Sequence, residues 1–497
     1  MTRSNLIGGE MLNWSDLRPG DARPAAAGPA AAALLAASLT ADDAVLLAGP
    51  HAVELVSAVA SQVASADLLV RSAPDAEELA ELLDGVKGQV FCGSVDRFAA
   101  AEGESYDVIV ALDGLERLVG PDTANFPWAD ALDRLRGRLR PGGRLLLGAT
   151  NTFGFDRLIQ PDITAALPRD EDWARDTADR APAGLKPLLT ALQAAGFNTA
   201  EPTGVARTPV IAEDAGTTWV AGTTADAAQV WGRAYAVFPS LVRAEVAVSS
   251  VEGFAAVVAA RAVAACNEGP VLMDPYRVVL DAAAAELAFE LAPAWYFLVG
   301  AEGPAVLPEG VVPAGEGVLL EEHLLLALRA DDQAELRRVI PGYVAWLGAG
   351  GAGSPDNVIF DGSTYRLFGE PQELDVVEHL RRFAQRTLEG GSRQPWPAAA
   401  DSHALTGRLA AMAGITVPEQ EFSPEEVIRP RGSAEQLATV ARLADELAHA
   451  SARAILFEGT VSGIRRSRPY RVGHAVMNPA RVIRRRLERV LRKVRRR

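Results

Sequence analysis

The chain has 497 residues, a net charge of −15 and only two cysteines. This length exceeds what one ordinary hydrophobic core supports and predicts about three domains. The balance of 49% apolar and 23% charged residues is typical of globular proteins. No run reaches the roughly eighteen uninterrupted apolar residues of a membrane span. Two cysteines give no disulfide framework and no metal-ligand spacing, so we expect a reducing, cytoplasmic location.

The N-terminal third reads as alternating strands and helices. The small-residue run 25–37 follows Glu10 and Asp16, which are not the basic leader of a signal peptide, so we expect a helix there. Short β-rich apolar runs then alternate with helical patterns up to about residue 150. The predicted strands are 44–50, 68–70, 90–92, 106–112 and 143–147.

The clearest unit lies between Tyr106 and Leu147. The run Tyr106-Asp-Val-Ile-Val-Ala-Leu112 is a strand pattern, and Leu139-Arg-Pro-Gly-Gly-Arg-Leu-Leu-Leu147 is a Gly-Gly turn leading into another. About twenty residues of helical pattern separate them, which suits a parallel crossover. Ligands of such sheets bind at the carboxyl ends of the strands.

These segments resemble class I S-adenosylmethionine-dependent methyltransferases over roughly residues 30–215. Asp-Val-Ile-Val and Leu-Arg-Pro-Gly-Gly-Arg-Leu-Leu-Leu carry most of the resemblance. It implies a Rossmann-like α/β domain over residues 1–215 and S-adenosylmethionine as cofactor. It also implies a site formed by residues that follow the first four strands.

The resemblance departs from the family pattern at three cofactor contacts. After the first strand, a Gly-x-Gly turn that closes on the methionine part is replaced by Gly49-Pro50-His51, and Pro50 lacks a backbone donor. The ribose-binding acid after the second strand is replaced by Arg71, which cannot accept hydrogen bonds. Ser94 stands where an acid normally reaches the adenine amine.

Two alternatives follow for the cofactor. Either it binds in a divergent way, through Gly49, Arg71, Ser94, Leu112 and the best-preserved polar position, Asp113, or it is not bound at all. Arg71 has two further interpretations of its own: a partner for a ribose phosphate, as in dinucleotide enzymes, or a solvated charge at a strand end. The missing glycine fingerprint disfavours the dinucleotide interpretation.

Two residues are candidates for acid–base catalysis. His51 falls in a strand-end turn where ligands bind, so it is placed to position a substrate or accept a proton. Glu116, shortly after Asp113, is a second candidate base. The alternatives are a turn histidine without a role and a solvated first-turn acid favoured by the helix dipole. We expect no metal, because the six histidines show no ligand spacing.

Residues 227–299 read as mixed α/β. We expect helices at 253–266 and 278–291 and strands at 271–273 and 294–299. The region is either a second small α/β module or an extension of the first sheet.

Residues 318–460 read as an α-rich domain that follows a Gly- and Pro-rich linker. It contains a β-hairpin near 357–368, whose two β-rich runs are joined by Asp361-Gly362. The preceding Ser354-Pro-Asp-Asn357 is similar to part of a motif of aminoglycoside-type phosphotransferases. The His-x-Asp pair of that family is absent upstream, so we interpret the hairpin as structural.

The C-terminal residues 464–497 form a basic tail with fourteen Lys or Arg and one acid, Glu488. Subtracting the tail's +13 from the total of −15 leaves −28 on the rest of the chain. Apolar residues every three or four positions from Val476 to Val494 predict an amphipathic helix. The arginine-rich residues 465–497 then bind an anionic membrane surface or an acidic partner, or fold onto the chain's own acidic face.

The hypotheses for function are therefore three. The first is S-adenosylmethionine-dependent methyl transfer to a bacterial natural product, peptide or surface glycan. The second is a cofactor-free methyltransferase fold that serves as a scaffold or partner subunit. The third is a peptide-modifying complex that dehydrates or epimerises residues. Nucleic acid is not an expected partner, because −28 charges outside the tail repel a phosphate backbone.

Overall fold

The computed structural model describes most of the chain in two compact units, Met1–Glu435 and Gln436–Arg497. The described residues are 4–18, 24–98, 105–120, 122–123, 126–160, 181–197, 209–211, 219–221, 233–249, 251, 253–267, 271–300, 318–367, 371–396, 399, 401–418 and 428–467.

The first unit contains an eleven-stranded, largely parallel sheet in the order β1-β4-β3-β2-β5-β6-β11-β9-β10-β8-β7. The strands are β1 (Ser4–Gly8), β2 (Ala44–Ala48), β3 (Ser65–Val70), β4 (Val90–Gly93), β5 (Tyr106–Ala111), β6 (Leu139–Thr150), β7 (Pro209–Ile211), β8 (Trp219–Ala221), β9 (Arg233–Ser240), β10 (Arg243–Val248) and β11 (Ala294–Gly300). The five strands predicted before residue 150 are confirmed as β2 to β6. Sequence reasoning missed β1, which pairs in parallel with β4.

The sheet is doubly wound around β2. From β2 the chain moves outward through β3 and β4, then returns to add β5 and β6 on the other side. The strand order therefore reverses between β2 and β5, and ligands of open α/β sheets bind outside the carboxyl ends of the strands at such a point. The predicted Rossmann-like fold is confirmed.

Residues 227–299 add three strands to this same sheet. β11 runs antiparallel to β6 on one side and to β9 on the other, and β10 pairs with β9. The strand predicted at 294–299 is confirmed as β11, but the strand predicted at 271–273 is wrong. Val271 makes only an isolated bridge to Gly432, because Asp274 immediately caps a helix by accepting a hydrogen bond from the backbone N–H of Tyr276.

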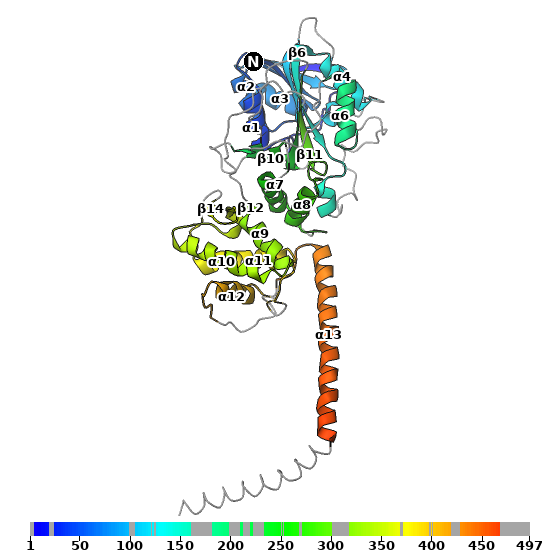
Figure 1. The fold of residues 1–497 in the computed structure, drawn as a ribbon. Helices are drawn as coiled ribbons and strands as arrows, with labels where there is room; N and C mark the ends of the chain where they lie inside the picture. The colour runs from blue at the N-terminus through cyan, green and yellow to red at the C-terminus, as the bar shows by residue number, and fades with distance from the viewer. Residues whose placement is uncertain are drawn as a thin grey trace, which may run out of the picture. The chain divides into compact units, whose positions relative to one another are not determined.

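Helices cover both faces of the sheet (Figure 1). One face packs against α1 (Pro29–Ser38), α2 (Val53–Gln62) and α3 (Ala73–Leu82). The other packs against α4 (Trp128–Arg136), α5 (Phe155–Ile159), α6 (Leu185–Ala194), α7 (Gly253–Cys266) and α8 (Pro275–Ala284). Side chains alternate between the two cores, as strand geometry requires: Leu46 joins one and Leu47 the other.

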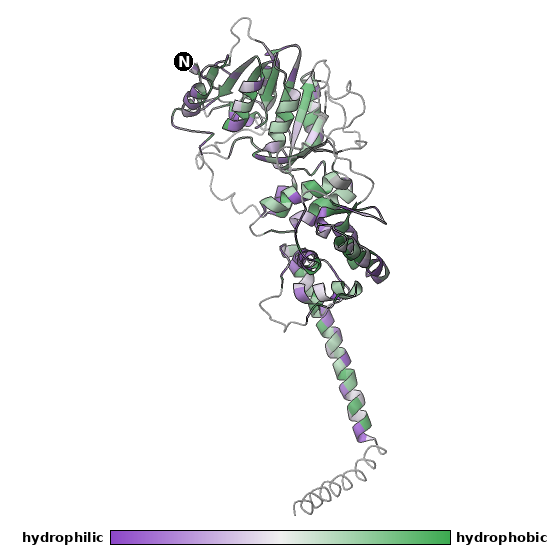
Figure 2. Cartoon of the chain, turned by 90° about the vertical axis from the view of Figure 1, so that its left-hand side faces the viewer, coloured by the Kyte–Doolittle hydropathy of each residue, from purple (hydrophilic) through white to green (hydrophobic). Residues whose placement is uncertain are grey.

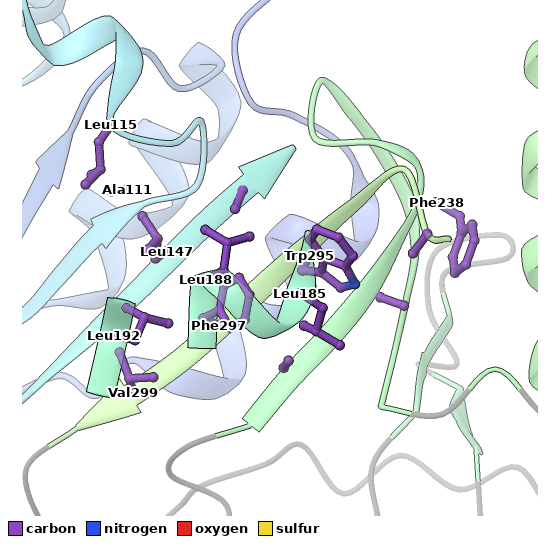
Figure 3. Packing of buried hydrophobic residues seen from close by; sticks show 14 of the residues in the cluster. Ala111, Leu115, Leu147, Leu185, Leu188, Leu192, Phe238, Trp295, Phe297 and Val299 are labelled. Carbon is purple, nitrogen blue, oxygen red and sulfur yellow. The ribbon is translucent and has the colours of Figure 1, made fainter. Parts of the chain in front are cut away.

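The packing of α6 shows how the second core is built. Leu185, Leu188 and Leu192 recur every three or four residues and therefore lie on one helix face. In Figure 3 this face lies over β6 and β11, beside Phe297 and Val299. This contact ties β11 into the methyltransferase-like sheet.

The first unit continues into a mainly helical region with its own core. It comprises α9 (Leu320–Arg329), α10 (Gln333–Gly348), α11 (Val376–Glu389) and α12 (Ser402–Met412), with the short strands β12 (Val318–Leu319), β13 (Val358–Phe360) and β14 (Tyr365–Leu367). The predicted hairpin is confirmed as β13 and β14. Its turn uses Gly362 at φ +102°, a conformation that favours glycine.

The long helix α13 (Ser433–Arg466) leads from the end of the first unit through the second. The sequence interpretation did not predict it as an element. The amphipathic helix predicted between Val476 and Val494 lies outside the described residues. Within the part of the chain that the structure covers, no helix combines the length and apolar character needed to cross a bilayer.

Candidate functional site

The predicted cofactor-binding residues gather at one edge of the sheet. Gly49 follows β2, Arg71 follows β3, Ser94 follows β4, and Leu112 and Asp113 follow β5. Parallel strands end at the same edge, so these residues come together there. The structure therefore brings the predicted residues to one place, and their partners determine what that place can do.

His51, the first candidate base, is buried with both ring nitrogens engaged. Nε2 accepts from the backbone N–H of Leu112 at 3.2 Å, so Nδ1 carries the proton that is donated to the Gly49 carbonyl at 3.0 Å. Burial lowers the pKa of His51 and keeps the ring neutral. The imidazole thus links the ends of β2 and β5 and has no nitrogen left to accept a substrate proton.

Arg71, the residue at the ribose position, forms a buried bidentate ion pair with Asp16. Nε and Nη2 donate to the two carboxylate oxygens at 2.8 and 2.7 Å, and Nη1 donates to the Val119 carbonyl at 3.0 Å. Only 2% of Arg71 is exposed, so the interpretation as a solvated strand-end charge is wrong. Burial alone raises the pKa of Asp16, but the bonds and charges of Arg71, with the charge of Arg117, hold it below 3.8.

Asp113 is neutralised in the same way by Arg117. The guanidinium donates from Nε and Nη2 to the two carboxylate oxygens, at 2.6 and 2.5 Å. Arg117 also donates to the Pro24 carbonyl, and its Nη1 lies 3.8 Å from Asp16. Two arginines and two aspartates thus form one buried, electrically balanced network.

Ser94, at the adenine position, faces the chain's own N-terminal segment. Its backbone N–H donates to the Gly8 carbonyl at 2.9 Å, and its hydroxyl hydrogen-bonds Thr123. Gly9 lies so close to Ser94 that a Cβ built on Gly9 would be 2.8 Å from the Ser94 Cβ. The φ of Gly9 is +76°, which also favours glycine at this position. The backbone around Gly8 and Gly9 therefore covers the end of β4.

The segment that carries Asp16 is fixed across the end of β3. The backbone N–H of Met11 donates to the Arg71 carbonyl, and the Met11 carbonyl accepts from Ala73. Asp75 then accepts from the Ser15 hydroxyl at 2.5 Å and from the Asp16 N–H at 2.7 Å. The sequence gives no signal for this arrangement, because Asp16 is one acid in an unpatterned stretch 55 residues before Arg71.

These contacts do not suit S-adenosylmethionine as the resemblance would bind it. The methionine turn is bridged by His51, the ribose position holds a cation paired with Asp16, and the adenine position is covered by Gly8 and Gly9. An adenosyl group would have to displace these buried hydrogen bonds. The cofactor-binding roles of the five residues remain predictions, and no reaction step is derived through the cofactor.

Two further groups of this edge bear on chemistry. Glu116, the second candidate base, opens a 3-10 turn and is half-buried, with a carboxylate oxygen beside Gly114. Tyr296 of β11 is fully buried, and its hydroxyl has no hydrogen-bond partner among the described residues. Burial, with the charge of Asp113, raises the pKa of Tyr296.

A second polar cluster joins the sheet to the helical region. A cavity of about 350 Å³ lies beside α8, α9 and α11, and Glu321 and Arg386 line it. They form an ion pair at 2.6 Å, and burial raises the pKa of Glu321. Within the described chain, Glu321 Oε2 and the Tyr276 hydroxyl have no hydrogen-bond partner. Sequence reasoning missed these residues, because isolated charges on helices look like solvated positions.

Ser354 and His379 form a pair that resembles a nucleophile and its base, with Oγ 2.8 Å from Nδ1. The Ser354 hydroxyl, however, donates to Gln372 Oε1 at 2.8 Å, so the imidazole is placed to donate to the serine and not to deprotonate it. Both residues are buried. The pair therefore holds α11 against the turn before β13. Among the described residues, no group of three or more His, Cys, Asp or Glu side chains is arranged to hold a metal ion.

Comparison with solved structures gives matches to class I methyltransferases over part of the chain. A putative methyltransferase from Bacillus halodurans is 17% identical, over 33% of this chain and 67% of its own, with a TM-score of 0.24. N-methyltransferase NodS from Bradyrhizobium japonicum, in complex with S-adenosyl-L-homocysteine, is 17% identical over 22% of this chain and 54% of its own (TM-score 0.19). The [4+2]-cyclase SpnF is 16% identical over 33% and 53% (TM-score 0.23).

No family model and no curated protein matches the chain. The chain spans little more than half the length of NodS. A shared fold does not by itself fix a reaction. What the sheet itself establishes is a methyltransferase-like Rossmann fold in the N-terminal region.

Proposed function

We propose that this protein is a cofactor-free methyltransferase-fold subunit that works through binding a protein partner. The observation that carries the proposal is the Asp16–Arg71–Arg117–Asp113 network across the carboxyl ends of the strands. A cofactor site needs polar groups that are free to meet the ligand, whereas here the charged groups meet one another.

The electrostatic cost of reopening the site supports this proposal. Separating one partner of a buried ion pair leaves an uncompensated charge and costs about 3–5 kcal/mol. A micromolar ligand supplies about 8 kcal/mol of binding free energy in total. Breaking the Asp16–Arg71 pair would consume about half of that free energy before the lost backbone bonds at Gly8 are counted.

The three substituted contacts belong to one pattern. Pro50 removes a donor at the methionine turn, Arg71 removes an acceptor at the ribose position, and Ser94 weakens the acceptor at the adenine position. In each loop the missing contact is matched by one within the chain. A protein that had kept methyl transfer would need all three loops to open together.

The experiment that tests the proposal is calorimetric titration of the full chain with S-adenosylmethionine and S-adenosylhomocysteine. We expect no saturable heat up to 1 mM ligand. Thermal unfolding gives an independent readout, since a ligand present at one hundred times its Kd stabilises a protein by about 2.7 kcal/mol. Micromolar binding would overturn the proposal and make methyl transfer to a natural product, peptide or surface glycan the working function.

A double variant distinguishes a cofactor site that no longer exists from a cofactor site that the N-terminal segment covers. Asp16→Leu combined with Arg71→Met removes both charges of the buried pair and keeps apolar side chains in the space they fill. We expect this double variant to bind no cofactor either, because Pro50 and His51 still shape the methionine turn. If it does bind, the N-terminal segment covers a competent pocket, and the protein is an autoinhibited methyltransferase.

The partner and the location remain parts of the same proposal. Positive charge is concentrated in the arginine-rich residues 465–497, whereas the rest of the chain carries a net charge of −28. These residues would therefore contact an anionic membrane surface at the inner face of the cytoplasmic membrane, or an acidic protein. Co-sedimentation with anionic vesicles, with and without the residues after Asn478, tests this. Equal sedimentation of both chains would exclude the tail as the membrane contact.

A further inference from the structure

The helix α13 (Ser433–Arg466) carries an unusual amount of exposed apolar surface. None of its side chains is buried. Nine large apolar residues are 46–71% exposed, and six of them are Val440, Leu443, Leu447, Phe457, Val461 and Ile464. Figure 2 shows hydrophobic segments repeating along this helix. Contiguous apolar surface on this scale marks an interaction site.

The spacing of these residues follows one rule. From Val440 to Ile464 the steps are three, four, three, four, three, four and three residues, and the two remaining positions are Ala450 and Ala454. Every a and d position of a heptad repeat is therefore apolar over three and a half heptads. A period of 3.5 residues is the signature of a coiled-coil seam and not of a helix that packs on a globular core. We call these eight residues the seam.

Three residues of the seam have the types typical of two strands. The a positions include β-branched Val440 and Val461, and Leu443 lies at a d position, the combination typical of parallel dimers. Gly459 and Gly463 lie outside the seam, and each costs the isolated helix about 1 kcal/mol relative to alanine. Because α13 contains two glycines and none of its described side chains is buried, we infer that it gains stability from a partner helix.

The charges that flank the seam point to a second copy of the same helix. Arg453 occupies a g position and Glu458 the following e position, and both are exposed. In a parallel pair, g of one helix faces the following e of the other, so two Arg453–Glu458 pairs form, one on each side. The other such contacts within α13 are Thr439 with Ala444, Glu446 with Ser451 and Thr460 with Arg465, so no like charges meet.

We propose that two copies of this chain associate through α13 as a parallel two-stranded coiled coil. The occupant is a second α13, matched to the first by the seam and by the Arg453–Glu458 pairing. This inference goes beyond the cofactor-free subunit proposed above and does not depend on it, because the seam takes no part in the sheet.

A membrane surface fits this helix less well than a second copy does. Helices that lie in a bilayer surface present lysine and arginine on the polar face. The polar residues of α13 alternate in sign, with Arg442 paired to Glu446 and His449 beside Asp445. Ile455 and Leu456 are also exposed, but they occupy b and c positions on the helix face away from the seam and remain outside a two-stranded contact.

The test is the mass of the full chain in solution at micromolar concentration, from light scattering after size exclusion and from sedimentation equilibrium. We expect twice the 52.5 kDa of one chain. Leu447→Lys and Phe457→Lys, both in the seam, should each weaken association more than tenfold. The matched control is Leu456→Lys, which introduces the same charge at a residue that is 71% exposed outside the seam and should leave the dimer intact.

Charge exchange tests the parallel orientation. Arg453→Glu and Glu458→Arg should each weaken the dimer, since each places like charges opposite one another, and the double variant should restore it. A monomer at all concentrations, or equal effects of the seam and control variants, would overturn the proposal. So would a monomer whose binding to anionic vesicles is lost with Leu447→Lys, which would assign the seam to a membrane.

Discussion

The edge of the sheet around Arg71 and the surface of α13 are opposites. At the sheet edge, charged side chains that ordinarily face solvent or ligand are buried and paired within the chain. On α13, apolar side chains that ordinarily face a core are exposed. The charged groups of the sheet edge are therefore paired within the chain, whereas the apolar side chains of α13 remain exposed.

This difference supports the proposal that the protein associates with other molecules through α13 and not through the sheet edge. A fold alone suggests that function lies at the carboxyl ends of the strands, because ligands of α/β sheets bind there. In this protein the charged side chains of that region instead form ion pairs with one another. The unpaired surface lies on α13, so the comparison favours association over chemistry.

The largest effect should come from breaking the network at Asp16. Asp16→Asn leaves the guanidinium of Arg71 buried without a countercharge, and we expect a loss of about 3–5 kcal/mol in the free energy of unfolding. Urea denaturation followed by circular dichroism measures it. The comparison of the two regions fails if the loss is no larger than at the exposed pair of Arg277 and Asp281, where Asp281→Asn should cost about 1 kcal/mol or less.

The network also predicts acid sensitivity. The pKa of Asp16 is held below 3.8 in the folded protein, so its contribution is fully present above that pH and is lost as the pH falls further. The Asp16→Asn variant should lose this part of the pH dependence. A variant with the same acid profile as the natural chain would show that Asp16 is not the titrating group.

The sequence predicted the scaffold because periodicity is a local property. The runs at 44–50 and 106–112 are mostly apolar, so these strands could be placed without tertiary information, whereas the Gly142-Gly143 turn predicted before Leu145 lies inside β6 (Leu139–Thr150), where the pairing with β5 shifts register. The gathering of Gly49, Arg71, Ser94 and Asp113 at one edge followed from strand order alone.

What the sequence could not give is the partner of each polar group. Asp16 meets Arg71 only after the N-terminal segment crosses the sheet edge, and no local pattern encodes that path. The seam of α13 is a different case, since its 3.5-residue spacing is visible in the sequence and was missed. Alanines at two of its eight positions, Ala450 and Ala454, make the apolar pattern from Val440 to Ile464 less conspicuous.

Tyr296 is an exception within the closed edge and sharpens the comparison. Its hydroxyl is buried without a hydrogen-bond partner among the described residues, a condition that costs about 1–3 kcal/mol. Tyr296→Phe should therefore raise the free energy of unfolding, by about 1 kcal/mol or more. If Tyr296→Phe instead destabilises the protein, the hydroxyl has a hydrogen-bond partner in solution, as it would if a ligand occupied the edge. The control is Tyr343→Phe, which removes a hydroxyl that donates to the Gly353 carbonyl and should destabilise the protein.

The smallest effect concerns the titration of His51. Burial keeps its folded pKa below the ordinary 6.5, so the unfolded chain takes up the proton first as the pH falls. The stability that His51 contributes is complete above pH 6.5 and declines below it, by less than about 1 kcal/mol at pH 6. His51→Gln should flatten the pH dependence of stability between pH 7 and 5.5, whereas His449→Gln, at an imidazole that is 75% exposed on α13, should leave it unchanged. If the natural chain and both variants show the same pH dependence of stability, His51 is not buried at the sheet edge in solution. The contrast between the closed sheet edge and the exposed surface of α13 would then be weakened.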